Sequence, residues 1–266
     1  MLSVYIFIGI IVFLNRCPVY LIQTDFMKAE ELFQELKSYC IEHANPELVT
    51  KYSRYFKEGV YDAWGLSQAL MDAKKDELKK AGNLTVDLVF DTAPLLMKSG
   101  KYEETSFVLI LLSLVKDKLQ KTDIQRIENL FETGIRNWAH ADYLGMFFLP
   151  ELMKQDLMGK EDFRGWVTSP YKFQRRCVPV TFIKLLKTGV AYPELFTFLE
   201  PLMSDPEREV HQGMGWFLRE AWKLKNAETE TFLLKWKDTA PRLIFQYACE
   251  KMDKAGKARF KRSVKP

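Results

Sequence analysis

The sequence has few of the residues that build metal sites and disulfide frameworks. Its 266 residues include three histidines and four cysteines, and no two cysteines have C-x-x-C spacing. The cysteines are Cys17, Cys40, Cys177 and Cys249. Structural zinc sites and disulfide-stabilised secreted domains need more regular patterns than this. We therefore expect no metal ion, no disulfide framework and a reducing, cytoplasmic environment.

Strict alternation of apolar and polar residues is also missing, which removes a β-sheet from the predicted architecture. Apolar residues instead recur at three- and four-residue steps, the period of an amphipathic α-helix. Examples are Phe107, Ile110, Leu111, Leu114 and Val115. Gly213 and Gly215 match no phosphate-binding loop, and their small size predicts that helices approach closely there. The sequence predicts an all-α protein.

Turn-forming residues divide the helical pattern at intervals typical of helical hairpins. Helix ends are predicted at Ser99-Gly100, Thr188-Gly189 and Lys225-Asn226, and a helix start at Thr122-Asp123. Antiparallel helix pairs that stack on one another curve into a superhelix with a concave surface. A compact, irregular helical bundle is the alternative that the same pattern allows.

The composition is that of a globular protein, with 47% hydrophobic and 28% charged residues. These values argue against a disordered chain and against a polytopic membrane protein. We expect one domain over residues 27–253, an apolar leader over residues 1–26 and a basic tail over residues 254–266. The leader's apolar run is shorter than the ~20 residues that cross a bilayer. We predict that the leader is an extension from an incorrectly chosen start site, because Met27 begins an amphipathic helix; a membrane anchor is the alternative.

Positive charge is unevenly distributed, although the net charge is only +4. No acidic residue lies between Phe163 and Pro193. The basic residues in that interval are Arg164, Lys172, Arg175, Arg176, Lys184 and Lys187. Local positive charge of this kind attracts polyanions such as nucleic acids. A solvated helix face explains the same pattern equally well.

Four residues form a candidate catalytic group. Trp138 and Asp142 are four residues apart, so on an α-helix their side chains share one face. Arg176 follows in the stretch Phe173-Gln-Arg-Arg-Cys-Val178. Trp216 lies in the run Gly-Met-Gly-Trp-Phe-Leu-Arg-Glu that ends at Glu220. We interpret these four residues as a catalytic site that consists of two indoles, a carboxylate and a guanidinium.

At these residues the chain resembles the AlkD-like DNA alkylation repair family, HEAT-like repeat proteins that remove alkylated purines from DNA. In that family a Trp precedes the catalytic Asp by four residues, an Arg follows in a Trp/Phe-x-x-Arg stretch, and a second Trp opens a Gly-Trp-x-Leu-Arg-Glu run. The similarity also takes in segments 51–59 and 241–247. It implies a HEAT-like superhelix with a concave, basic DNA-binding face. Phe173 stands where family members often have Trp, and Pro179 follows Arg176 closely, so we expect substrate preference to differ.

The resemblance implies a DNA glycosylase in which Asp142 is the catalytic residue. Breaking an N-glycosidic bond develops positive charge on the sugar, which a nearby carboxylate stabilises while it positions water. A base made cationic by alkylation at N3 or N7 departs without being protonated, so one carboxylate suffices. Trp138 and Trp216 would place their electron-rich faces against the deoxyribose and the cationic nucleoside.

Basic side chains are expected to contact the DNA backbone. Arg176 would bind a phosphate through its planar guanidinium. On a helical projection Arg176 lies beside Lys172 and Lys187, whereas Arg175 lies toward apolar neighbours. These four residues and Arg219 are the candidates for DNA contact. The expected partner is duplex DNA with alkylated bases, bound by a monomer without a cofactor and without stable membrane association.

Each functional interpretation has a structural alternative. Trp residues at helical spacing usually pack in cores, and an Asp on a helix is usually a solvated charge or a cap. His140 lies between Trp138 and Asp142 but points to another side of the helix, so a structural hydrogen bond is favoured over a role as general base. For the whole protein, the alternative is a non-catalytic helical-repeat module that binds DNA structures or a protein partner.

Overall fold

The computed structural model describes residues 27–56 and 61–263, and within these ranges the chain forms helices and no strand. The predicted all-α class is therefore confirmed. No helix in the described ranges is long and apolar enough to cross a membrane. The predicted leader, residues 1–26, lies outside the described residues.

Fourteen α-helices follow one another in the described part of the chain. They are α1 (Ala29–Glu42), α2 (Pro46–Ser53), α3 (Gln68–Ala81), α4 (Val86–Met97), α5 (Tyr102–Val115), α6 (Ile124–Thr133), α7 (Trp138–Tyr143), α8 (Leu149–Lys154), α9 (Lys172–Phe182), α10 (Tyr192–Leu199), α11 (Arg208–Leu224), α12 (Asn226–Trp236), α13 (Arg242–Ala248) and α14 (Lys254–Arg259). A π-helical turn, η3 (Leu144–Phe148), joins α7 to α8. The short 3-10 helices are η1 (Lys116–Lys118), η2 (Lys121–Asp123), η4 (Lys160–Phe163), η5 (Trp166–Thr168), η6 (Lys184–Lys187) and η7 (Glu200–Ser204).

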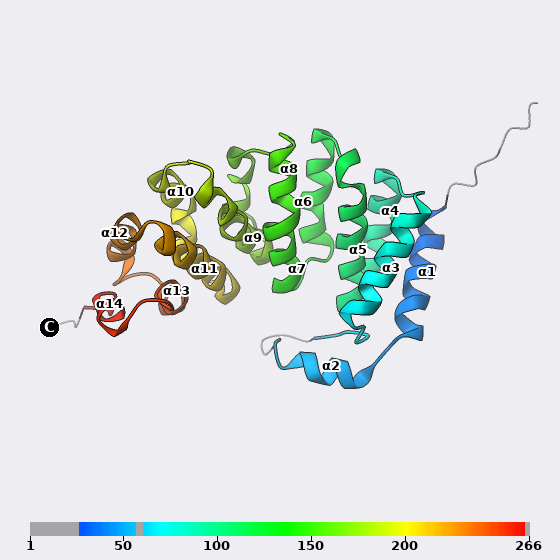
Figure 1. The fold of residues 1–266 in the computed structure, drawn as a ribbon, viewed down its shortest axis with the longest axis horizontal. Helices are drawn as coiled ribbons and strands as arrows, with labels where there is room; N and C mark the ends of the chain where they lie inside the picture. Colours follow the sequence, from blue (N-terminus) through cyan, green and yellow to red (C-terminus); the bar gives the residue numbers. More distant parts are fainter. Residues whose placement is uncertain (1–26, 57–60, 264–266) are drawn as a thin grey trace, which may run out of the picture.

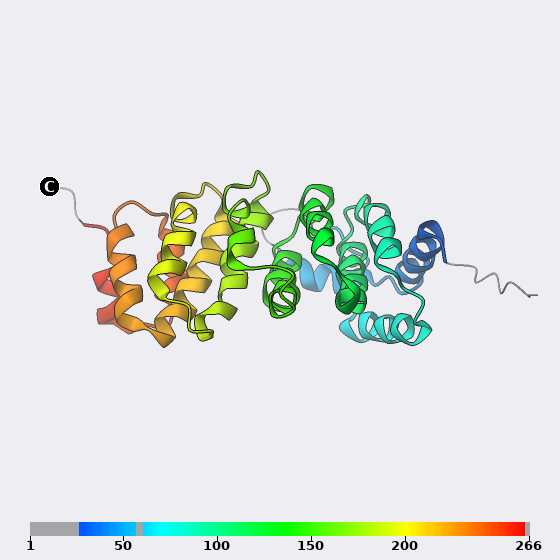
Figure 2. The same ribbon diagram turned by 90° about the horizontal axis from the view of Figure 1, so that it is seen from above.

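The helices form two rows that bend into an arc. In the inner row α5, α7, α9, α11 and α13 each pack against the next, and α4, α6, α10 and α12 lie alongside this row (Figure 1). Seen from above, the helices follow one another along the long axis from α1 to α14 (Figure 2). Helix α2 lies across the open side of the arc, below the end that carries α3 and α5. This arrangement confirms the predicted HEAT-like helical-repeat superhelix.

The predicted helix boundaries follow from local chemistry. Helix α4 ends at Met97 and is followed by Gly100 at φ +77°, a conformation that glycine adopts without strain. Gly189 at φ +87° likewise follows η6. Helix α6 begins directly after Asp123, and α11 ends at Leu224, as predicted. The turn residues therefore mark where the repeats fold back.

Two glycines of α11 allow three helices to pack closely. A Cβ on Gly215 would lie 2.5 Å from the Cβ of Tyr247 on α13, and a Cβ on Gly213 would lie 3.2 Å from the Cγ of Arg176 on α9. Helix α11 therefore sits directly between α9 and α13, with Trp216 one residue beyond Gly215. The predicted close approach of helices at these glycines is confirmed.

Candidate active site

The inner side of the arc contains a cleft of about 750 Å³ between α2, α5, α7, η3 and α11. Its wall is rich in aromatic side chains. These are Tyr52, Tyr55, Phe56, Tyr61, Tyr102, Trp138, Tyr143, Phe147 and Trp216. The carboxylate-bearing Asp142 lines the same cleft. Three of the four residues predicted as a group, Trp138, Asp142 and Trp216, thus meet in one cavity, and the fourth lies directly behind it.

Arg176 holds the side chain of Asp142 through two parallel hydrogen bonds. Its Nε donates to Oδ1 of Asp142 at 2.8 Å, and its Nη2 donates to Oδ2 at 2.7 Å. The remaining Nη1 donates to the main-chain oxygen of Glu209 at 2.6 Å. The Arg176 side chain is only 6% exposed, against 15% for Asp142. The guanidinium therefore fixes the orientation of the carboxylate from below the cleft wall.

Arg176 is buried, and its expected contact with a phosphate stays a prediction. Helix α11 covers this face of α9, with Gly213 against the Arg176 side chain, and the guanidinium is engaged by Asp142 and Glu209. Contact with a phosphate would require that pairing to break. The projection considered α9 alone, and it could not show the helix that packs over it.

Arg175 is also placed differently from its projection toward apolar neighbours. It is partly exposed, and it donates from Nε to Asp205 at 2.6 Å and from Nη1 to the carbonyl oxygen of Ser169 at 2.7 Å. Its guanidinium therefore joins the start of α9 to the segment before α11. The acidic partner lies thirty residues away in the sequence, so a helical projection gave no sign of it.

Two more of the predicted DNA contacts carry charges that are offset within the protein. Lys172 pairs with Glu209 at 2.6 Å, and Arg219 pairs with Glu220 at 3.1 Å and also with Glu250. The first of these acids comes from α11, outside the acid-free interval of the sequence. Positive charge on the inner face is therefore smaller than the run of basic residues indicates. DNA contact by these residues stays a prediction.

Trp138 both packs and lines the cleft. Its ring stacks on Phe56 at 5.4 Å between centroids, and Phe56 stacks on Tyr61 at 4.4 Å with the planes 1° apart. The aromatic residues after α2 therefore form one wall of the cavity against α7. The site residues predicted from the sequence did not include them, although Tyr52 and Phe56 lie in the segment 51–59 that carries part of the family resemblance.

A buried carboxylate on α5 fixes that wall. The side chain of Glu103 accepts hydrogen bonds from the backbone N–H groups of Trp64, Gly65 and Leu66 at 2.8, 2.8 and 3.1 Å. Gly65 has φ +84°, which a side chain would strain. Glu103 therefore ties the segment after Tyr61 to the inner row of helices.

His140 forms structural contacts beside the cleft. Its ring stacks on Tyr102 at 4.6 Å, and its Nε2 lies 2.9 Å from the Oγ of Ser106. Because that hydroxyl donates to the carbonyl oxygen of Tyr102, we assign the proton to Nε2, which leaves Nδ1 buried without a partner. Burial lowers the pKa of His140 to about 4, so the ring is neutral near pH 7. These contacts support the structural interpretation of His140.

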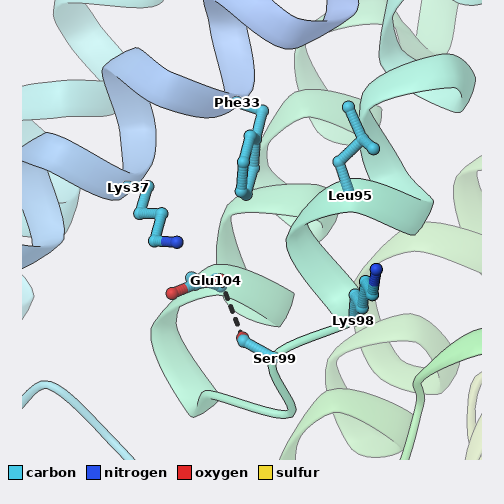
Figure 3. A pocket seen from close by; sticks show the side chains of 6 residues that line it. All are labelled: Phe33, Lys37, Leu95, Lys98, Ser99 and Glu104. Carbon is cyan, nitrogen blue, oxygen red and sulfur yellow. Dashed lines mark hydrogen bonds between the residues drawn. The ribbon is translucent and has the colours of Figure 1, made fainter.

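A second cavity, of about 380 Å³, lies between α1, α4 and α5 (Figure 3). Its acidic residue, Glu104, accepts a hydrogen bond from the hydroxyl of Ser99 at 2.7 Å and another from the indole of Trp64 at 2.9 Å. The carboxylate therefore supports the fold. Elsewhere in the described ranges, no group of three or more His, Cys, Asp or Glu side chains is arranged to hold a metal ion.

Fold and site together define a helical-repeat protein that offers an oriented carboxylate in an aromatic cleft on its inner face. The chain belongs to the DNA alkylation repair enzyme family, whose model matches residues 36–252. This membership supports a role in the repair of alkylated DNA and identifies DNA as the class of substrate.

A solved structure supports the same fold. The predicted DNA alkylation repair enzyme from Enterococcus faecalis superposes with a TM-score of 0.64 over 80% of this chain and 98% of its own, at 15% sequence identity. At that identity the likeness shows the fold alone. No curated protein matches the chain.

Proposed function

We propose that the protein is a DNA glycosylase that hydrolyses the N-glycosidic bond of purines made cationic by alkylation at N3 or N7 in duplex DNA. This reaction is the first step of base excision repair. The observation that supports it most is the carboxylate of Asp142, which lines an aromatic cleft while Arg176 fixes its orientation. We expect the protein to act as a cytoplasmic monomer without a metal ion or an organic cofactor.

Asp142 has the capacity to act on the sugar while it remains paired. Each carboxylate oxygen has two acceptor positions, and Arg176 uses one on each oxygen. The others are left for a water molecule or for the electron-poor sugar carbon. A carboxylate held in one orientation need not reorganise when positive charge develops on the sugar, which is how preorganised groups lower a barrier.

The two indoles complete the proposed site. Trp138 and Trp216 line the cleft beside Asp142, and both are partly exposed. A cation against an indole face gains about 0.5 to 2 kcal/mol. Because the alkylated base carries its charge before the bond breaks, these rings favour the cationic nucleoside over an unmodified one. No acidic group is then needed to protonate the leaving base.

A non-catalytic module that binds DNA structures or a protein partner is the second candidate. It is favoured by the pairing of Asp142 with Arg176, since a carboxylate already bonded to a guanidinium is also a common structural element. The two candidates differ in one measurable product. Only the glycosylase releases free base and leaves an abasic site.

The test uses Asp142→Asn and Asp142→Glu with a duplex that contains N7-methylguanine. Under single-turnover conditions both variants should release base at least ~100-fold more slowly than the parent, because the charge is lost in one and displaced in the other. Asp91→Asn is the matched control, since Asp91 is exposed on α4 and does not line the cleft. Thermal unfolding of each variant is measured alongside, because Asp142 neutralises the buried Arg176. Base release by folded Asp142→Asn at the parent's rate would refute the assignment.

A further inference from the structure

An exposed aromatic side chain stands at the mouth of the cleft. Phe147 on η3 is 62% exposed, whereas the adjacent Phe148 is buried. The centroid of the Phe147 ring lies 5.8 Å from that of Tyr143, and the Nζ of Lys184 lies 5.8 Å from the centroid of the Phe147 ring. A π-helical turn frequently occurs at functional sites. Here it presents one large apolar ring to solvent next to a cation.

A third cavity, of about 360 Å³, lies just beyond Phe147, between η6 and the end of α11. Three lysines, Lys184, Lys187 and Lys223, line it together with the single acid Glu220. The remaining lining residues are Ile183, Leu186 and Leu224. Lysines on apolar walls suit a compact anion better than a small cation.

The charges of two of these lysines are available to a ligand. Lys184 and Lys187 are exposed, and neither makes a salt bridge within the described residues. Lys223 pairs with Glu220 at 2.6 Å. The pKa of Glu151 is lowered mainly by its hydrogen bond from Lys154, and the charge of Lys184 makes only a smaller contribution. Lys184 and Lys187 thus differ from Lys172, Arg175 and Arg176, whose charges are all paired with acidic side chains.

The third cavity adjoins the cleft at Phe147. Phe147 lines the cleft, and the Nζ of Lys184, which lines the third cavity, lies 5.8 Å from the centroid of its ring. One duplex can therefore meet both places at once.

We propose that Lys184, Lys187 and Lys223 bind a backbone phosphate of the duplex whose damaged nucleotide lies at Asp142, and that Phe147 packs against the DNA between these two places. The inference rests on the proposed function for the position of the lesion. The lysines contribute charge without reading sequence, whereas Phe147 contributes an apolar contact. This difference makes the two contributions separable by salt.

The test measures equilibrium binding over a range of salt concentrations, with an undamaged duplex and with one that contains a tetrahydrofuran abasic analogue. Binding to either duplex can be measured without base release. Lys184→Ala/Lys187→Ala should lower the salt slope by up to about one unit, because contact with one phosphate contributes about 0.9. Phe147→Ala should weaken binding roughly five- to tenfold at every salt concentration, with the parent's slope. The matched control is Lys79→Ala/Lys121→Ala, which removes equal charge from exposed lysines outside the three cavities.

The outcomes separate this inference from the glycosylase assignment. An unchanged slope in the Lys184/Lys187 variant, or an equal fall in the control pair, would overturn the phosphate site. A fall in the slope with Phe147→Ala, or no loss of affinity, would overturn the apolar contact. If the variants change the salt slope and the affinity as predicted but the parent releases no base, the glycosylase proposal fails and this inference stands. Circular dichroism confirms that each variant is folded.

Discussion

Gly145 faces Val180 so closely that a Cβ on Gly145 would lie 2.9 Å from the Cγ1 of Val180 and 3.1 Å from the carbonyl oxygen of Cys177. Side-chain carbons do not normally approach that near. The missing side chain therefore allows η3 to pack directly on α9. Because Asp142 lies three residues before Gly145 and Arg176 lies four before Val180, this contact sets the distance across which the ion pair forms.

Replacement of Gly145 by alanine should separate the two helices. The added methyl group has to push against Val180 and the α9 backbone, and such overpacking typically costs about 1–3 kcal/mol. We expect the free energy of unfolding in urea to fall by that amount. The rate of base release should also fall, because Asp142 and Arg176 are moved apart.

Gly165→Ala provides the control for this prediction. A Cβ at Gly165 would meet nothing within 4 Å, and its φ is not positive. Its free energy of unfolding should stay within about 0.5 kcal/mol of the parent's. Equal stability of the Gly145 and Gly165 variants would show that the close packing is not needed.

Substitution of Arg176 should act through Asp142 and leave the salt dependence of DNA binding unchanged. Arg176→Lys keeps a positive charge but cannot make two parallel hydrogen bonds. A carboxylate that is free to rotate should slow base release by roughly 10- to 100-fold. Arg176→Ala removes one partner of a mostly buried pair and should cost about 3–5 kcal/mol of folding stability.

Single-turnover base release, urea unfolding and the salt slope distinguish this role from phosphate binding. Arg164→Lys is the control, since Arg164 is 66% exposed and pairs with Glu161 on the surface. A salt slope lowered by about one unit in Arg176→Lys would instead indicate that Arg176 contacts a phosphate.

The stability of the protein should depend on pH through His140. Its pKa is lowered by burial from 6.5 to about 4. The unfolded chain therefore takes up a proton as the pH falls below 6.5, while the folded protein does not do so until about pH 4. The contribution of the neutral ring is complete above pH 6.5 and is lost as the pH falls to 4, by up to about 3 kcal/mol.

His140→Gln removes this titration. Between pH 7 and pH 4 the unfolding free energy of the parent should therefore fall by up to about 3 kcal/mol more than that of the variant. His43→Gln retains His140 and should keep the parent's decline. Parallel stability curves for the parent and His140→Gln would contradict the assignment of a buried neutral ring.

Local signals account for much of the fold. Apolar periodicity identified the helices, Gly100 and Gly189 marked ends, and Gly213 and Gly215 marked close packing, because each depends on neighbours in the chain. The spacing of Trp138 and Asp142 likewise placed both at one cleft, since one helix turn carries them.

The partners of the charged residues could not be predicted from the sequence. The Asp142–Arg176 pair joins residues thirty-four positions apart, and Lys172 on α9 pairs with Glu209 on the neighbouring helix α11. A periodic pattern shows which face of a helix is apolar, but it does not show which helix covers that face. For the same reason Phe147 and the aromatic residues that follow α2 were not among the predicted site residues.

Two separate sets of hydrogen bonds support the cleft. In one, Glu103 accepts from three consecutive backbone N–H groups; in the other, Arg176 donates to Asp142. The wall formed by α2 and its following segment depends on an anchor in α5, whereas the orientation of the Asp142 carboxylate depends on Arg176 in α9. For the proposed glycosylase, the width of the entrance and the orientation of Asp142 would therefore depend on separate parts of the chain.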